Sequence, residues 1–168
     1  MTLVLGLALV PPLLSACLWD VRHRLIPDWT VLWVGGVGVA ASALAALSGD
    51  GSSALVGIAA AGAICLLVGA LAARGGLWGW GDGKLFGAAG LVVGVDGLMP
   101  LLMGTALSGG LFALFLIALR GPVRSGVIAL PASAPRWLKA EQTRLRRHPS
   151  VPYAVAITTG LATALMKA

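Results

Sequence analysis

Long apolar runs constrain the fold of this chain more than any other feature of its sequence. Leu3–Trp19, Trp29–Leu47 and Ala54–Ala73 each approach the roughly 20 residues that a helix needs to cross a bilayer. Only 11% of the 168 residues are charged, against about 25% in an average soluble domain. So few charges cannot cover a surface that faces water, so the sequence predicts an all-α membrane protein.

The remaining apolar sequence predicts three further helices. Leu85–Leu119 is too long for one span and is interrupted by Asp96-Gly97 and Pro100, so we expect a short fourth helix and a longer fifth helix. Val151–Met166 supplies the sixth helix. The expected fold is a polytopic bundle of about six transmembrane helices that forms a single domain over residues 1–168.

The basic residues predict how this bundle lies in the membrane. An even number of spans places both termini on one side, and the loops at about 20–28, 74–84 and 120–150 on the other side. These three loops contain every Lys and Arg except Lys167, whereas the opposite turns carry Asp50 and Asp96. Basic loops stay on the cytoplasmic side, so we expect a cytoplasmic location for these loops and an outside location for both termini.

The net charge of +6 does not indicate nucleic-acid binding in such a chain. Basic residues beside anionic headgroups explain it, so the expected contact is membrane lipid and not nucleic acid. Cys17 and Cys65 lie in separate apolar runs, and His23 and His148 stand apart, so the spacing of a metal site is missing. We therefore expect no metal and no cofactor.

Two of the six acidic residues are placed where a catalytic pair would lie. Asp20 ends the first helix and Asp82 opens the fourth, so the topology returns both to the same membrane boundary, where an acid is costly. Two carboxyl groups that meet there cannot both ionise at low cost. One would hold a proton while the other stays charged, as in an aspartic protease. From the residues alone, ion pairs are an equally good interpretation, with Arg22, Arg24 or Lys84 as partners.

Asp82 follows a glycine-rich segment, with five glycines among the ten residues from Gly75 to Lys84. Glycine lets a second backbone approach closely, as an extended substrate must do beside a catalytic acid. A phosphate-binding loop would need Ser or Thr after Lys84 and glycine at position 78. Leu85 and Trp78 stand there, so that interpretation fails.

These motifs resemble those of the type IV prepilin leader peptidases and of the related archaeal preflagellin peptidases. The run Asp20-Val21-Arg22-His23-Arg24-Leu25-Ile26-Pro27-Asp28 is similar to that family's Asp, basic residue and Ile-Pro-Asn. Gly79-Trp80-Gly81-Asp82-Gly83-Lys84 matches its Gly-x-Gly-Asp-x-Lys motif. Val151-Pro152-Tyr153-Ala154-Val155-Ala156-Ile157 resembles the segment that opens its last helix.

The resemblance implies an aspartic endopeptidase of the Gly-x-Gly-Asp type, with Asp20 and Asp82 as catalytic residues and without a metal. It implies prepilin or pseudopilin substrates, whose short basic leader precedes an apolar helix. Cleavage would occur at the leader boundary, on the cytoplasmic face of a bacterial inner membrane. The residues expected to support the active-site loops are Gly79, Gly81, Lys84, Ile26, Pro27 and Asp28.

The sequence departs from the family pattern at Asp28, where Asn is usual, and at Val155, where Pro is usual. Asp28 directly precedes the expected second helix, so we expect it to cap that helix. Only residues 20–28 join the first two helices, which leaves no room for the cysteine-rich loop of larger members that also methylate their product. The chain therefore resembles the small tight-adherence (Flp) pilus type, and methylation is not expected.

Three other interpretations stay open. A presenilin-like protease shares the Gly-x-Gly-Asp motif, but it would hold its acids deeper in the bilayer and cut inside an apolar helix. A small transporter would place paired acids near the membrane midplane between broken helices, and a noncatalytic assembly subunit would tolerate the loss of either aspartate. The sequence indicates neither the particular pilin nor the oligomeric state.

Overall fold

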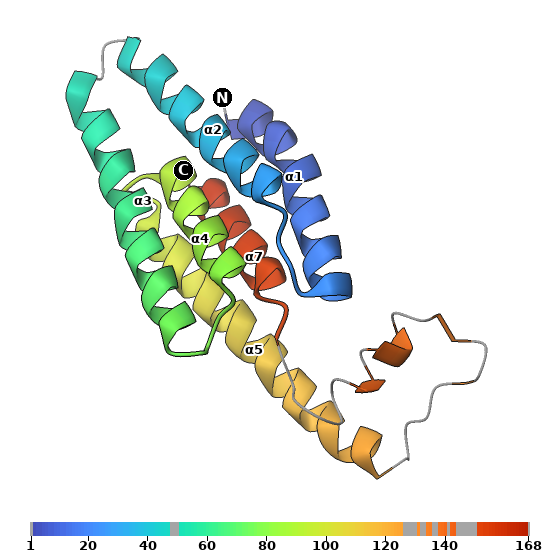
Figure 1. Ribbon diagram of the computed structural model, residues 1–168. Coiled ribbons are helices and arrows are strands. Elements are labelled where there is room, and N and C mark those ends of the chain that lie inside the picture. Colours follow the sequence, from blue (N-terminus) through green and yellow to red (C-terminus); the bar gives the residue numbers. More distant parts are fainter. Residues whose placement is uncertain are drawn as a thin grey trace.

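The structure is a computed structural model that describes residues 2–47, 51–125, 131, 134–135, 138–140, 142–143 and 151–167. The described residues contain no strand, and their long helices form one bundle (Figure 1), which confirms the predicted all-α fold. These helices are α1 (Thr2–His23), α2 (Asp28–Ala45), α3 (Gly51–Arg74), α4 (Trp80–Val93), α5 (Leu98–Arg124) and α7 (Tyr153–Lys167).

Three of these helices contain segments long and apolar enough to cross a membrane: Val4–His23, Leu55–Arg74 and Leu98–Val123. The apolar segment of α2, Asp28–Leu44, is shorter. The 14 residues of α4 rise only about 21 Å, less than the roughly 30 Å of a hydrocarbon core. Large apolar side chains such as Leu32, which is 74% exposed, cover the outside of the bundle, as expected where lipid replaces water.

The two chain ends lie near the same end of the bundle, and the α1–α2 and α3–α4 connections lie toward the opposite end (Figure 1). These connections are shorter than the sequence suggested. Because α1 continues to His23 and α4 begins at Trp80, the loops shrink from 20–28 to Arg24–Pro27 and from 74–84 to residues 75–79. Polar residues prolong the helices beyond the apolar runs. Hydropathy alone therefore placed the end of the first helix too early and the start of the fourth too late. Most of the expected loop at 120–150 lies outside the described residues.

The predicted break in the fourth apolar stretch lies slightly earlier than expected. Gly94 ends α4 with a φ of 64°, and Gly97 is the N-cap of α5. Asp96 belongs to this turn, but Pro100 lies in the first turn of α5, where its missing N–H costs no helical hydrogen bond. The break therefore comes from the glycines and not from the proline.

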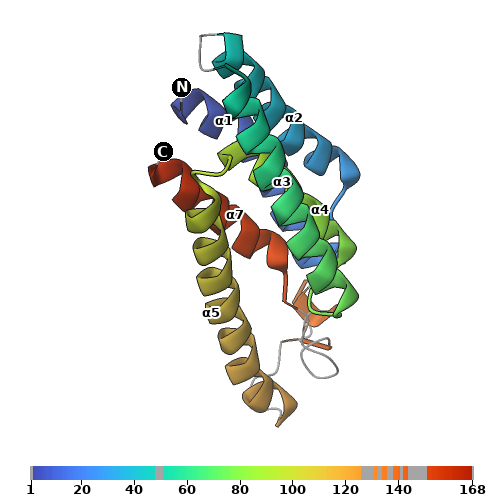
Figure 2. The same ribbon diagram turned by 90° about the vertical axis from the view of Figure 1, so that its left-hand side faces the viewer.

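The central helix of the bundle is α4, which packs against α3, α2 and α7. Its side chains of Leu85, Phe86 and Ala89 are almost completely buried. Glycines bring the backbones together, since a Cβ at Gly69 of α3 would lie 2.5 Å from the Cα of Gly83 in α4. Figure 2 shows α7 between α5 and the α3–α4 pair, and α7 also packs against α1.

Candidate active site

Asp20 lies in the last turn of α1 and its side chain is only 4% exposed. Its Oδ2 accepts a hydrogen bond of 3.0 Å from the backbone N–H of Ala154, in the first turn of α7. An N–H in the first turn of a helix has no partner within that helix, and the positive end of the helix dipole favours an acid there. The start of α7 therefore fixes the position of Asp20.

Asp82 lies in the first turn of α4, where it is 8% exposed. Its Oδ2 accepts a hydrogen bond of 3.0 Å from the backbone N–H of Gly79, the N-cap residue. An acid at the third helical position commonly reaches back to the N-cap in this way. Its other oxygen, Oδ1, is buried and has no hydrogen-bond partner among the described residues. The Gly-x-Gly-Asp spacing thus holds one oxygen and leaves the second available.

The two aspartates line one cavity of about 270 Å³. Predicted site residues from both motifs meet there, although they come from separate parts of the chain: α1, the α1–α2 connection, the start of α2, and the start of α4 with the residue before it. Of the eight residues predicted for the site, only Pro27 is not in the lining, and it lies beside the cavity as the N-cap of α2. The lining residues are Asp20, Arg24, Leu25, Ile26, Asp28, Gly79, Trp80, Gly81, Asp82 and Lys84.

The surroundings of Asp82 shift its carboxyl group toward the neutral form. Asp82 lies outside the three segments that are long enough to cross a membrane. Burial raises its pKa from 3.8 to about 6, and the nearby charge of Asp20 adds to this effect. The N–H of Gly79 and the charge of Arg24 act in the opposite direction. The two aspartates therefore interact electrostatically, as expected of a catalytic pair.

The two sequence motifs pack directly against each other beside this pair. A Cβ at Gly81 would lie 3.2 Å from the Cβ of Ile26, so a side chain there would crowd the α1–α2 connection. Pro27 turns the chain into α2 with a φ of −63° and a ψ of 133°, and the hydroxyl of Thr30 donates to its carbonyl at 2.7 Å. These contacts position the two connections relative to each other.

A sequence model of the type IV leader peptidase family matches residues 7–114 of the chain, a range that includes both aspartates. The chain belongs to the type IV leader peptidase family. Neither the comparison with curated proteins nor that with solved structures gave a match. Membership of this family and the apolar helices together indicate a membrane-embedded peptidase.

One sequence-based assignment in this leader peptidase is wrong. Asp28 does not cap α2, because Pro27 is the N-cap and no side chain caps that helix. Asp28 is the first helical residue, and its Oδ1 instead accepts a 2.9 Å hydrogen bond from Nζ of Lys84. This ion pair joins α2 to α4 at the rim of the cavity.

Arg24 is a site residue whose role the sequence did not reveal. It ends α1 in the left-handed conformation, with a φ of 57°, where glycine is the usual residue. Its backbone N–H donates to the carbonyl of Asp20 at 2.9 Å, and its side chain lines the cavity. The backbone of Arg24 therefore turns the chain so that a positive charge enters the site.

Ala154 is the second such residue, because its contribution comes from its backbone. It lies within the segment that resembles the opening of the family's last helix, but beyond the matched range 7–114.

Trp80 also lines the cavity. Among the described residues, no three His, Cys, Asp or Glu side chains are grouped so that they would hold a metal ion.

Proposed function

We propose that this leader peptidase is an aspartic endopeptidase in which Asp20 and Asp82 hydrolyse the bond between the leader and the apolar helix of a prepilin or pseudopilin. The observation that carries the proposal is the shared cavity, because it joins two buried carboxyl groups from different helices. Membership of the leader peptidase family supports the same assignment.

In this mechanism the two carboxyl groups start in different protonation states. Asp82 starts protonated, in accord with its raised pKa of about 6, and Asp20 starts as the carboxylate. Asp20 takes a proton from a water molecule, whose oxygen attacks the peptide carbonyl carbon. Asp82 protonates the carbonyl oxygen. The tetrahedral intermediate then collapses: the C–N bond breaks, the leaving nitrogen takes up the proton held by Asp20, and one hydroxyl of the intermediate returns a proton to Asp82 as the carbonyl of the new carboxyl group forms.

The proposed site of cleavage is the cytoplasmic face of a bacterial inner membrane. The cavity lies at the end of the bundle where the α1–α2 connection and the neighbouring helix ends carry the basic residues Arg22, Arg24, Arg74 and Lys84, and basic residues at a helix end favour the cytoplasmic side. The α1–α2 connection, Arg24–Pro27, is short and contains no cysteine. This favours the small tight-adherence type, with Flp-type prepilins as substrates and without a methylating activity.

The decisive experiment is co-expression with a Flp-type prepilin, with leader removal followed by gel shift and N-terminal sequencing of the product. Asp20→Asn and Asp82→Asn should each lower the cleavage rate by roughly 10²–10⁴-fold, the range typical of a lost general acid or base. Asp96→Asn is the matched control, because Asp96 lies in the α4–α5 turn, beyond the end of α4 opposite to Asp82.

The outcomes separate the proposed function from its alternatives. Full cleavage by both Asp20→Asn and Asp82→Asn, in variants that still insert into the membrane, would exclude the aspartic mechanism. A product whose new N-terminus lies inside the apolar helix would indicate a presenilin-like protease. Cleavage at the leader boundary that depends on both aspartates would establish the proposed reaction.

A further inference from the structure

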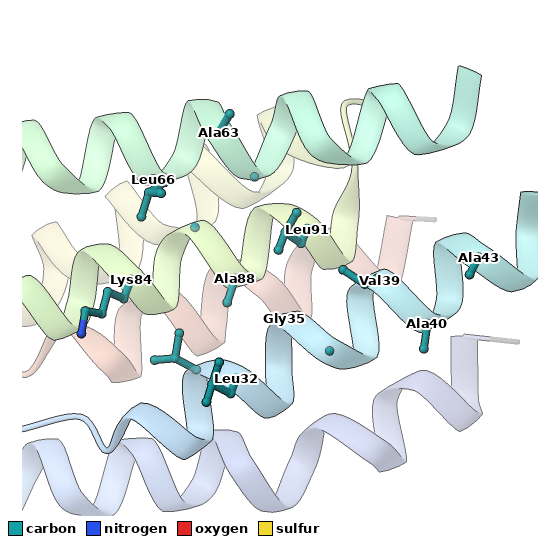
Figure 3. Close-up of a pocket in the computed structure, with 14 residues that line it drawn as sticks. Leu32, Gly35, Val39, Ala40, Ala43, Ala63, Leu66, Lys84, Ala88 and Leu91 are labelled. Carbon is teal, nitrogen blue, oxygen red and sulfur yellow. The ribbon is translucent and has the colours of Figure 1, made fainter. Parts of the chain in front are cut away.

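An apolar groove of about 790 Å³ runs along the bundle between α2 and α3 (Figure 3). Its floor is α4, with Gly87, Ala88 and Leu91, and its walls include Leu32 on α2 and Leu66 on α3. Leu32 and Leu66 are exposed, so the groove opens to the outside of the bundle. In a membrane, this opening faces the lipid.

The groove begins at the candidate active site. Lys84 lines both the groove and the cavity that contains Asp20 and Asp82. Figure 3 shows Lys84 on α4 at one end of the row of lining side chains. Its ion pair with Asp28 therefore lies where the apolar groove meets the polar cavity. A molecule lying in the groove would therefore end beside the cavity that contains the two aspartates.

The lining of the groove suits a helix. Eight of its fourteen residues are Gly or Ala, and residues this small let a second helix backbone approach closely in lipid. Gly36 on α2 is the most open, because a Cβ there would meet no atom within 4 Å. The wall from Val31 to Ala43 is roughly 18 Å long, which matches about 12 residues of an α-helix.

We propose that this groove binds the apolar helix of the substrate and thereby places the bond before that helix in the active-site cavity. The proposal rests on the proposed function, because it assumes a substrate with a polar leader followed by an apolar helix. The continuity at Lys84 favours this occupant. The Asp28–Lys84 pair marks the boundary at which charges are tolerated, and a substrate changes from apolar to polar at the same depth.

A pair of glycine substitutions tests the groove. Gly36→Leu would place a large side chain in it, from a position where a Cβ meets no atom within 4 Å. Gly110→Leu is the matched control. Gly110 lies on the exposed side of α5, its Cβ position also has no atom within 4 Å, and it is not part of the groove. Each variant is assayed on the full prepilin and on a water-soluble peptide that spans the leader boundary but lacks the apolar helix.

We expect Gly36→Leu to raise KM for the full prepilin about tenfold or more, which corresponds to roughly 1.4 kcal/mol of binding free energy. Cleavage of the soluble peptide by Gly36→Leu, and of both substrates by Gly110→Leu, should stay close to that of the wild type. If Gly36→Leu cleaves the full prepilin with the KM of the wild type, the groove does not bind the substrate helix. The proposed function would not be affected by that result. Failure of the unsubstituted protein to cleave either substrate would overturn both.

Disulfide crosslinking identifies the occupant directly. The protein carries Cys17→Ala and Cys65→Ala, Asp82→Asn to keep the substrate uncleaved, and either Gly36→Cys or Gly110→Cys. A prepilin with one cysteine in its apolar helix should form a disulfide with the Gly36→Cys protein only. A disulfide between two copies of the Gly36→Cys protein that the substrate does not displace would identify a second copy as the occupant. If Gly36→Cys forms a disulfide neither with the prepilin nor with a second copy, lipid is the occupant of the groove. A disulfide between two copies and the absence of any disulfide would each contradict the proposal.

Discussion

The carboxyl group of Asp20 accepts a 3.0 Å hydrogen bond from the backbone N–H of Ala154, although the two residues are 134 positions apart in the sequence. Asp82 receives a bond of the same length from Gly79, only three positions away. One candidate catalytic acid is thus held by its own helix and the other by a distant helix. The position of Asp20 depends on how α1 and α7 pack together.

Replacing the donor of that bond should impair catalysis. Ala154→Pro removes the N–H in the first turn of α7, where proline is compatible with a helix. Losing a hydrogen bond to a charged group costs roughly 1.5–3 kcal/mol, so we expect kcat for prepilin to fall by about one to two orders of magnitude. Val155→Pro is the control, because it introduces proline at the following position and leaves the N–H of Ala154 in place. Equal losses in both variants would show that a distorted helix, and not the missing bond, causes the effect.

The activity should decline as the pH rises above about 6. The proposed mechanism needs Asp82 protonated at the start, and its pKa is raised to about 6 by burial and by the charge of Asp20. A group whose pKa is raised is protonated below that value and loses its proton as the pH increases through it. A profile of kcat/KM against pH in detergent or liposomes measures this decline in activity. A rate that is constant from pH 5 to about 8 would contradict a protonated Asp82.

Removing the charge of Arg24 should move the decline in activity to higher pH. The positive charge of Arg24 lowers the pKa of Asp82, so Arg24→Gln should raise that pKa further. The activity of Arg24→Gln should then persist to higher pH than that of the wild type, even if its maximum is lower. Arg22→Gln is the comparison, because Arg22 does not line the cavity. A shift toward lower pH, or an equal shift in both variants, would argue against this role.

The contact between α3 and α4 should tolerate no side chain at Gly69. A Cβ there would lie 2.5 Å from the Cα of Gly83, which is backbone and cannot rotate away. We expect Gly69→Ala to lower the free energy of unfolding by about 1–3 kcal/mol, as for other overpacked sites. Thermal unfolding in detergent measures the effect, with Gly110→Ala as the control with open space. A Gly69→Ala protein as stable as the control would mean that the helices separate easily.

The proposed topology predicts where reporters work. Alkaline phosphatase fused after Lys167 should be active. Both termini are expected outside the cytoplasm, and alkaline phosphatase folds only on that side of the membrane. The same enzyme fused within the loop at 120–150 should be inactive, and green fluorescent protein should show the reverse pattern. An inactive fusion after Lys167 would invert the orientation that the basic residues indicate.

Much of the site was predictable because periodicity and charge act locally. The apolar runs predicted the order of the helices. The first run ends just before Asp20 and the fourth begins just after Asp82, which placed both acids at one end of the bundle. The Gly-x-Gly-Asp spacing also has a local cause, since it sets Gly79 and Asp82 at the N-cap and the third helical position. The residues alone left the catalytic assignment of the two aspartates open, and the resemblance to the family's motifs supports it as a proposal.

What the sequence did not show depends on long-range packing. Asp28 was expected to cap α2 because capping is its commonest local role, but Lys84, 56 positions away, provides a partner. Ala154 carries no side-chain signal, because its contribution is a backbone N–H. The left-handed turn at Arg24 was also hidden, since sequence patterns assign that conformation to glycine.

The bond between Ala154 and Asp20 also has a consequence for biosynthesis. A ribosome makes both aspartates long before the start of α7 emerges, so the nascent chain inserts α1 and α4 while Asp20 still lacks this donor. In the proposed mechanism, the pair of aspartates would be complete only when α7 has been inserted and has packed against α1. Proteolytic competence would then depend on finished insertion, which would keep a partly translated peptidase from cutting proteins in the membrane around it.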